Sequence, residues 1–255
     1  MTCNKTQPNT FCYIFVTSFV TSLLHSKMLK ISNFNFESDK ILSSLLATNR
    51  DYFLSKAEQL TFKKGKLIFY DGGIPTGIFL IQKGRAKIYK RGIEGREQIF
   101  YIYKKGDLFG YHGLLCNEKY EDSCEALDDC IVWFVSKSDF EHLMVKIPKL
   151  KMLLIQNMSH EFGVLVNTIT VLAQKTLRER LALYLLVLNE RYDTVNNRTQ
   201  INLPREDLAN IIGTVRESLG RILKEFKEEK LISINNKSIE IIDFKKMLKL
   251  AGIKK

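Results

Sequence analysis

The sequence predicts an α+β protein with three parts: an antiparallel β-roll of jelly-roll type, a long helix, and a C-terminal winged helix-turn-helix. Three observations lead to this fold class. Short segments rich in Ile, Phe, Tyr and Val, separated by glycine turns, run from Phe62 to Val135. A long helical pattern follows Pro148. Two short amphipathic segments then flank Gly213, and an alternating hairpin pattern comes after them.

Length and charge agree with two domains and an anionic partner. The chain has 255 residues, a formal net charge of +11 and a sequence pI near 9.3. A basic chain of this size favours a polyanion, and charge alone does not separate nucleic acid from an anionic membrane surface. The helix-turn-helix favours double-stranded DNA and no membrane. We expect a sensor domain over residues 28–147, a dimerisation helix over 148–173 and a DNA-binding domain over 174–255.

Residues 1–27 form a predicted extension outside these domains. Their apolar run from Phe11 to Leu24 is interrupted by Ser and Thr, and a bilayer span needs about 20 apolar residues. No small-residue cleavage site of a signal peptide follows the run. We expect a poorly ordered extension that DNA binding does not require, with Met28 as the more natural first residue.

The first ordered part combines helix and strands. From about Ile41 to Leu60 the pattern is helical, and from Phe62 to Val135 it changes to short strands with glycine turns. Many short strands at this spacing are typical of an antiparallel barrel or jelly roll.

The helical segment after Pro148 has an apolar seam. Its members alternate at three- and four-residue steps, which is the spacing of a coiled coil; they are Ile155, Met158, Phe162, Leu165, Ile169 and Leu172. Three heptads are few for a free coiled coil, so the alternative is that the seam packs on its own β-roll. A hinge near Ala173–Thr176 leads into an amphipathic helix over Leu177–Glu190. A polar loop follows, and the basic tail after Asp243 reads as a solvated helix.

The helix-turn-helix lies between Leu203 and Ile232. Gly213 is expected to end the first helix, and Thr214 to cap the second. The first helix has an apolar face made of Leu208, Ile211 and Ile212, and the second is expected to bury Val215, Leu219, Ile222, Leu223 and Phe226.

Charged residues occupy the outer face of the second helix, starting at its N-terminal turn, which is the end of a recognition helix that meets base edges. A guanidinium donates two hydrogen bonds to guanine, and a carboxylate accepts one from cytosine. The expected DNA-binding residues are Arg216, Glu217, Arg221, Lys224, Thr214, Ser218 and Lys237. The alternative interpretation is that Glu217 closes a capping box with Thr214 and that the charged face is merely solvated.

A predicted hairpin makes this motif winged. The residues LISINNKSIEII alternate around a polar turn at Asn235-Asn236-Lys237. Lys237 at the tip is placed to touch a phosphate, although any exposed lysine has that capacity.

These segments resemble the Crp/Fnr family. The run TVRESLGRILKEFKEEKLIS is similar to that family's recognition helix and wing, with an R-E-x-x-x-R order closer to the cyclic-AMP receptor branch. The runs LIFYDGGIPTGIFLIQKGRAKIYK and IFYIYKKGDLFG resemble its cyclic-nucleotide-binding roll. The resemblance covers roughly residues 40–242. It implies a cytoplasmic transcription regulator, a parallel homodimer on a two-fold site with TGTGA-like half-sites, base contacts by Arg216, Glu217 and Arg221, and RNA polymerase as a partner.

The resemblance also indicates that cyclic AMP is not the effector. Tyr111 stands where the family's cyclic-AMP binders carry a ribose-binding Glu, and Asp122-Ser123 stands in place of their Arg-Ser pair. Leu165-Val166 replaces their adenine-binding Thr-Ser pair. A carboxylate beside a phosphate in a partly dry pocket is unfavourable. The roll then holds another small molecule or none; the candidate pocket residues are Tyr111, His112, Asp122, Ser123 and Leu165. The alternatives are that His112 is a hydrogen-bonded turn residue and that Tyr111 belongs to the core.

No metal, cofactor or catalytic site is expected. The five cysteines form no C-x-x-C pair and no His lies at ligand spacing. Trp133 occupies the position of the sensor-domain cysteine that holds an iron–sulfur cluster in the fumarate–nitrate branch. No nucleophile–base pairing appears, so the chain is not expected to be an enzyme. Two rival functions remain: a constitutive nucleoid-type DNA binder with a vestigial roll, and a cyclic-nucleotide-binding regulatory module.

Overall fold

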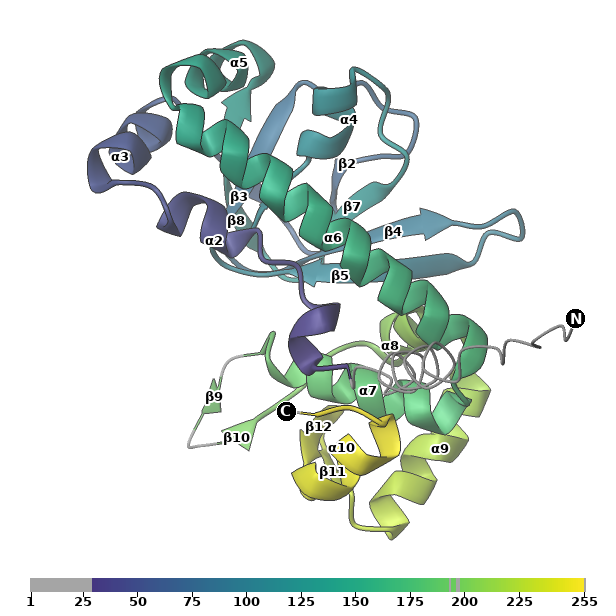
Figure 1. The fold of residues 1–255 in the computed structure, drawn as a ribbon. Helices are drawn as coiled ribbons and strands as arrows, with labels where there is room; N and C mark the ends of the chain where they lie inside the picture. The colour runs from purple at the N-terminus through teal and green to yellow at the C-terminus, as the bar shows by residue number, and fades with distance from the viewer. Residues whose placement is uncertain (1–28, 193, 196–197, 255) are drawn as a thin grey trace, which may run out of the picture.

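Two four-stranded antiparallel sheets face each other as a β-roll in the part of the chain that the structure describes (Figure 1). This structure is a computed structural model that describes residues 29–192, 194–195 and 198–254. One sheet has the order β1-β8-β3-β6 and the other β2-β7-β4-β5. The strands are β1 (Glu58–Phe62), β2 (Leu67–Phe69), β3 (Gly77–Lys83), β4 (Ala86–Arg91), β5 (Glu97–Tyr103), β6 (Leu108–Phe109), β7 (Ser123–Ala126) and β8 (Cys130–Ser136). The predicted roll is confirmed.

The segment before the roll is less helical than the sequence pattern indicates. A 3-10 helix η1 (Ile31–Phe34) and two short helices, α2 (Asp39–Ser43) and α3 (Ala47–Ser55), come first. The helical expectation up to Leu60 is wrong at its end, because Glu58–Phe62 is strand β1 and pairs along its whole length with β8. Pairing with a strand about 70 residues away in the chain is a tertiary effect that local periodicity does not report.

Aromatic side chains fill the space between the two sheets. The rings of Tyr103 and Phe109 stack with centroids 4.8 Å apart, and Phe79 lies 5.5 Å from Phe109. Offset aromatic pairs of this kind add to the free energy gained by apolar burial. The backbones of β3 and β8 approach so closely at Gly77 that a Cβ there would lie 2.2 Å from the carbonyl oxygen of Val135. Only glycine fits this position.

Three helices connect the roll to the C-terminal half. They are α5 (Lys137–Lys146), α6 (Pro148–Gln174) and α7 (Leu177–Asn189). A further short helix, α4 (Tyr111–Cys116), follows β6 and precedes β7 in the chain. Pro148 occupies the first turn of α6, where its missing N–H costs nothing. The helix breaks where the hinge was predicted, because Lys175 is extended and α7 starts with a capping box between Thr176 and Glu179. Figure 1 shows α6 running diagonally across the roll and down to the C-terminal half.

The C-terminal half is a winged helix-turn-helix, as predicted. Its elements are β9 (Thr194–Val195), β10 (Arg198–Thr199), α8 (Arg205–Ile212), α9 (Arg216–Glu228), β11 (Ile232–Asn235), β12 (Ser238–Ile241) and α10 (Phe244–Ala251). The short β9–β10 pair lies in the segment expected to be a loop. The tail was expected to be a solvated helix, yet α10 packs against α7 and buries Met247 completely.

One apolar cluster joins the two halves. It contains most of the C-terminal core together with Ile99 and Ile102 from the roll and Ile31 and Phe34 from η1. The backbone N–H of Lys254 also donates to the carbonyl oxygen of Leu29. Residues 29–34 therefore connect the end of the chain to the roll.

The predicted extension over residues 1–27 lies outside the described residues. Among the helices that are described, none has both the length and the hydropathy required to cross a lipid bilayer.

Candidate nucleic-acid interface

The turn between α8 and α9 brings the recognition helix to the surface. Gly213 ends α8 in the left-handed conformation, with φ +67°. A Cβ at this position would also lie 3.1 Å from Cδ2 of Leu172. Both the backbone conformation and the lack of space therefore favour glycine. The start of α9 needs a correction. Its N-cap residue is Val215, which is exposed rather than inward, and no side chain caps the helix. The capping box between Thr214 and Glu217 is therefore not formed.

The two faces of α9 otherwise separate as the pattern predicts. Leu219, Ile222, Leu223 and Phe226 are buried. The charged face is exposed, and it consists of Arg216, Glu217, Arg221 and Lys224, while Thr214 and Ser218 are half-buried. The Nζ of Lys224 lies 3.9 Å from Oε1 of Glu228, one turn further along α9. Neither Arg216 nor Arg221 has an ion pair with any residue that the structure describes. Their guanidinium groups are free to meet a ligand.

Helix α9 is fixed in place from its inner side. Arg178 of α7 donates to Glu225 at 2.9 Å and to Glu229 at 2.8 Å, and its guanidinium lies 4.9 Å from the centre of the Phe226 ring. These carboxylates lower the free energy of the Arg178 cation and raise its pKa. The anchoring uses the last turns of α9, so it leaves the first turns available for contact.

A cationic groove separates α9 from the wing. It has a volume of about 370 Å³ and its lining carries Arg205, Arg216, Lys224 and Lys227 but no carboxylate. Burial lowers the pKa of Arg205, and its Nη1 has no hydrogen-bond partner among the described residues. Arg205 and Lys227 were not among the sequence-predicted contacts. The available signals were a cation at the start of α8 and the three-residue step from Lys224 to Lys227, which places both lysines on one face of α9.

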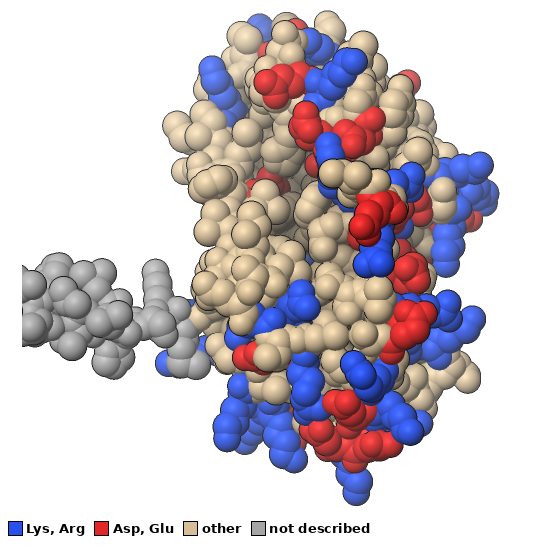
Figure 2. All heavy atoms as spheres, turned by 90° about the vertical axis from the view of Figure 1, so that its right-hand side faces the viewer, with Lys and Arg blue, Asp and Glu red and all other residues tan. Residues whose placement is uncertain are grey.

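The wing has the expected hairpin. Strands β11 and β12 pair from Ile232↔Ile241 to Asn235↔Ser238. Asn236 and Lys237 form the turn with φ +45° and +78°, as a two-residue hairpin turn with two left-handed residues requires. Lys237 is exposed at the tip. Figure 2 shows Lys and Arg gathered over the lower part of the molecule, the part that carries α9 and α10.

The first turn of α9 also faces the roll. A cleft of about 750 Å³ has the β4–β5 hairpin on one side and Thr214, Arg216 and Glu217 on the other. Next to it, the buried Lys87 of β4 lies 2.8 Å from Glu97 and 2.9 Å from Asp207 of α8. Burial opposes the charge of Lys87, but the carboxylates outweigh it and raise its pKa. This cluster holds the helix-turn-helix on the roll.

Helix α6 exposes most of its predicted seam. Phe162 is 71% exposed, Ile169 65% and Ile155 52%. Leu165 is exposed as well, whereas Met158 packs partly on the roll core and Leu172 is half-buried. A row of large apolar side chains along one helix marks an interaction surface.

Only two of the five residues expected to form an effector pocket, His112 and Asp122, border the same cavity. A small cavity of about 100 Å³ has His112 and Asp122 in its wall. Tyr111 is fully buried behind it, and Ser123 is buried and accepts from the N–H of Asp71. Leu165 is exposed on α6 and does not border the cavity. The expectation that all five residues line one pocket is therefore wrong for the single chain. Ligand pockets usually span about 300–1,000 Å³, so this one is too small for a nucleotide.

Side chains of the protein occupy the region between the roll and α6. Glu161 is buried and accepts from the Tyr111 hydroxyl at 2.9 Å and the Asn157 amide at 2.9 Å. His112 Nε2 lies 2.8 Å from its other oxygen. Burial by itself lowers the pKa of His112, but Glu161 outweighs it, so that pKa is raised. Burial also raises the pKa of Asp122 to about 6.

Asn157 and Glu161 were not among the residues predicted to line an effector pocket. The signal for them was two polar residues at a four-residue step on the inner face of α6, whose other buried residues are mostly apolar. A buried carboxylate needs hydrogen-bonding partners, and Tyr111, His112 and Asn157 supply them.

The described cysteines do not gather into a site. Cys124 and Cys130 are buried and Cys116 is exposed, whereas Cys3 and Cys12 lie outside the described residues. No group of three or more His, Cys, Asp or Glu side chains placed to hold a metal ion occurs in residues 29–192, 194–195 and 198–254.

Comparison with protein families divides the chain in the same way as its fold. Residues 59–146 match the cyclic nucleotide-binding domain, and residues 179–250 match the Crp-like helix-turn-helix domain. The first match covers the roll and the second covers the winged helix-turn-helix.

Curated relatives agree. The chain is 27% identical to the fumarate and nitrate reduction regulatory protein of Vibrio cholerae serotype O1, over 76% of this chain and 78% of that protein. It is 28% identical to electron transport regulator A of Shewanella oneidensis, over 74% of this chain and 77% of that protein. Both names are those of regulators rather than enzymes.

Solved structures share the fold. FixK2 from Bradyrhizobium japonicum superposes with a TM-score of 0.70 at 21% identity, covering 76% of this chain and 96% of that one. The regulator CLP of Xanthomonas campestris gives a TM-score of 0.68 at 18% identity, covering 78% of this chain and 100% of that one. The roll, the exposed recognition helix and the two domain matches lead to one conclusion: this chain belongs to the Crp/Fnr family of DNA-binding transcription regulators.

Proposed function

We propose that the chain acts as a homodimer that binds an inverted-repeat DNA site and regulates transcription in the cytoplasm. Crp/Fnr regulators bind DNA and commonly act as dimers. The observation that carries the proposal is the exposed charged face of α9 beside a groove whose only charged lining residues are cations. A two-fold dimer would present two such helices to successive major grooves, about 34 Å apart.

The dimer contact that we propose runs along α6. Ile155, Phe162, Leu165 and Ile169 are exposed there although they are large and apolar. Removing such side chains from water contributes roughly 25 cal/mol for each Å² of apolar surface buried. A parallel pairing of two α6 helices would bury these side chains and relate the two recognition helices by a two-fold axis.

The proposed role of each residue in DNA binding follows from the chemistry of its side chain. Arg216, Glu217 and Arg221 are the proposed base contacts, since a guanidinium and a carboxylate distinguish base edges. Lys224, Lys237 and the groove residue Arg205 are the proposed phosphate contacts, which give affinity and salt dependence but little sequence choice. Thr214 and Ser218 lie half-buried at the same end of α9 and are proposed as minor contacts.

We propose that cyclic AMP in its usual mode is not the effector. The cavity beside His112 is about 100 Å³, and the Asp122 carboxyl stands in its wall. The Tyr111–Glu161–Asn157 network occupies the region behind it. A ligand would have to break these hydrogen bonds before it could enter.

The division into domains also remains our proposal: residues 28–147 as sensor, 148–173 as dimer helix and 174–255 as the DNA-binding domain. RNA polymerase is the proposed protein partner.

The experiment that tests this function is a selection of sequences from random duplex DNA by the purified full chain, with and without cyclic AMP, at one stated salt concentration. Enrichment of an inverted repeat without cyclic AMP is the expected result. Enrichment only with cyclic AMP would contradict the effector argument. No enrichment in either condition would contradict sequence-specific recognition.

A further inference from the structure

A second, much larger cleft lies between the roll and the DNA-binding half. Its volume is about 1310 Å³. Its wall combines the β3–β4, β5–β6 and β7–β8 turns of the roll with the end of α7 and the wing. Any molecule that fills it contacts both halves of the chain at once.

The lining of this cleft is strongly cationic. Lys83, Arg85, Lys104, Lys105 and Arg191 border it, against the single carboxylate of Asp128. Neither Lys83 nor Lys105 has an ion pair with a described residue. Arg85 is paired with Asp128 and Arg191 with Asp107, so Lys83, Lys104 and Lys105 are the cations of the lining without a carboxylate partner among the described residues. An anion between these three lysines removes their mutual repulsion.

The only carboxylate of the lining is already satisfied. Asp128 accepts from Arg85 Nε at 2.7 Å and from Arg85 Nη2 at 3.1 Å, a bidentate pair. The Arg85 guanidinium also stacks 3.9 Å from the centre of the Tyr192 ring. Arg85 Nη1 and the Ser238 hydroxyl have no hydrogen-bond partner among the described residues, but both atoms are buried behind the surface of the lining. The accessible cations of the cleft are therefore its lysines.

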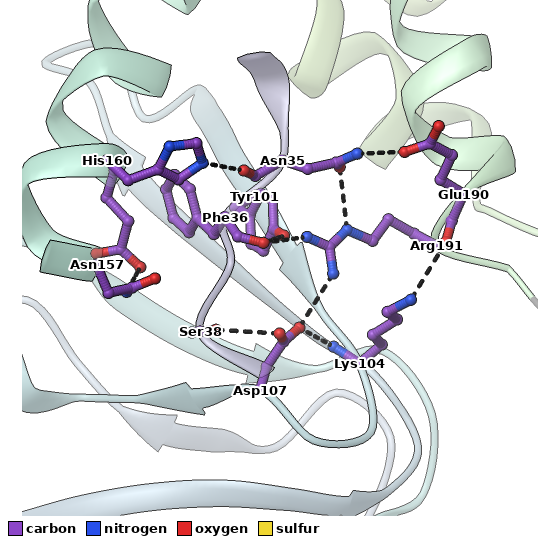
Figure 3. A network of polar contacts seen from close by, with 11 residues as sticks. Asn35, Phe36, Ser38, Tyr101, Lys104, Asp107, Asn157, His160, Glu190 and Arg191 are labelled. Carbon is purple, nitrogen blue, oxygen red and sulfur yellow. Dashed lines mark hydrogen bonds and ion pairs between the residues drawn. The ribbon is translucent and has the colours of Figure 1, made fainter. Parts of the chain in front are cut away.

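A rigid polar network forms the back of the cleft (Figure 3). Arg191 donates to the carbonyl oxygen of Phe36 at 2.8 Å and to Asn35 at 3.2 Å, and it pairs with the buried Asp107 at 3.4 Å. The Nζ of Lys104 donates to the carbonyl oxygen of Glu190 at 3.3 Å. These bonds tie the end of α7 to the roll, so this wall is formed before any ligand arrives.

The lining also contains several amide side chains. Gln59 and Gln82 come from the roll, and Asn202, Asn235 and Asn236 come from the DNA-binding half. Amide side chains both donate and accept hydrogen bonds, which suits the polar edge of a base or a sugar. The cleft thus offers both positive charge for phosphate and amide groups for hydrogen bonds.

The geometry points to this cleft as the binding site of a small polyanion, a nucleotide with two or more phosphate groups, that bridges the roll and the wing. A volume of this scale accommodates a nucleotide with its water, whereas a DNA duplex is a convex rod that lies on a surface. A bridging ligand binds only this arrangement of the two halves and therefore increases its population. Anion binding itself does not depend on the proposed DNA function, which enters only in this consequence.

The test measures anion binding to the full chain without DNA, by titration calorimetry with inorganic tripolyphosphate and with ATP. We expect one site per chain, at least tenfold tighter for either probe than for cyclic AMP, which has one phosphate. Lys83→Gln/Lys105→Gln should weaken binding at least tenfold. Lys149→Gln/Lys151→Gln removes the same charge from exposed positions at the start of α6, and it should leave the affinity unchanged.

A third variant excludes the groove beside the recognition helix. Lys224→Gln/Lys227→Gln should retain anion binding while it weakens DNA binding. Loss of tripolyphosphate binding in that variant would place the anion in the groove and overturn the proposal. Equal losses in the two lysine pairs Lys83/Lys105 and Lys149/Lys151 would show a diffuse charge effect and overturn it as well. If no anion binds and Lys83→Gln/Lys105→Gln instead weakens DNA binding, the cleft belongs to the DNA path and the proposal is wrong.

Discussion

Replacing Arg221 by Ala tests whether the outer face of α9 reads bases. Arg221 is exposed and has no ion pair with a described residue, so the free energy of unfolding should change by less than about 0.5 kcal/mol. A bidentate contact to guanine is worth about 1–3 kcal/mol of discrimination, or roughly 5- to 160-fold in affinity. A dimer has two half-sites, so the loss on a symmetric site should reach about 2–6 kcal/mol if the half-sites act independently.

The assay compares Kd on the selected inverted repeat and on random duplex of equal length, at two salt concentrations. The loss should fall on the inverted repeat, and base preference should relax at one position in each half-site. Lys245→Ala, on the exposed side of α10, removes the same charge as a control and should change neither quantity. If Arg221→Ala weakens binding equally on both duplexes, Arg221 contacts phosphate only and the assignment is wrong.

Contacts elsewhere in the chain give three further predictions. Phe162→Glu places a charge on the exposed apolar face of α6, so we expect monomers by sedimentation and a loss of roughly 100-fold or more in affinity for the inverted repeat. Arg191→Met leaves the buried Asp107 carboxylate without a cation, while its hydrogen bonds from Ser38 and the Lys104 N–H remain, so the free energy of unfolding measured in urea should fall by up to about 3–5 kcal/mol. The pKa of His112 is raised by Glu161; its stabilising contribution is therefore present below the usual pKa of 6.5 and is lost as the pH rises through the raised value. Unfolding by urea from about pH 5.5 to 8.5 should show this loss, and His112→Gln should remove it.

Each of these predictions has a control. Leu46→Glu alters an exposed apolar residue at the start of α3, outside the α6 seam, and should leave the dimer intact; dissociation of this variant too would contradict a specific seam. Adding Asp107→Asn to Arg191→Met should recover part of the lost stability, because it removes the unpaired charge. No recovery would mean that Arg191 acts through its contacts with Asn35 and Phe36 instead. An unchanged pH profile in His112→Gln would contradict the role of the ion pair with Glu161.

Local patterns in the sequence predicted the helix-turn-helix and the wing. The glycine turn at Gly213, the apolar face of α9 apart from Val215, and the two-residue turn of the wing each depend on neighbouring residues, and they are as predicted. The exposed charges of Arg216 and Arg221 follow from the same helical period. The start of α9 was predicted less well, since a T-x-x-E spacing permits a capping box but does not require one.

Strand β1, the environment of Tyr111 and the large cleft depended instead on contacts between distant parts of the chain. Residues 58–60 became strand because β8 was there to pair with them. Whether Tyr111 lines a pocket or is buried depended on Glu161, which stands 50 residues later on α6. The cleft bordered by Arg85 and Arg191 exists only because η1 and α7 pack the two halves together. Helical period, glycine turns and charge are local properties that a sequence records directly, whereas a pocket is the space left between elements after they pack, so only the tertiary structure determined where a ligand fits.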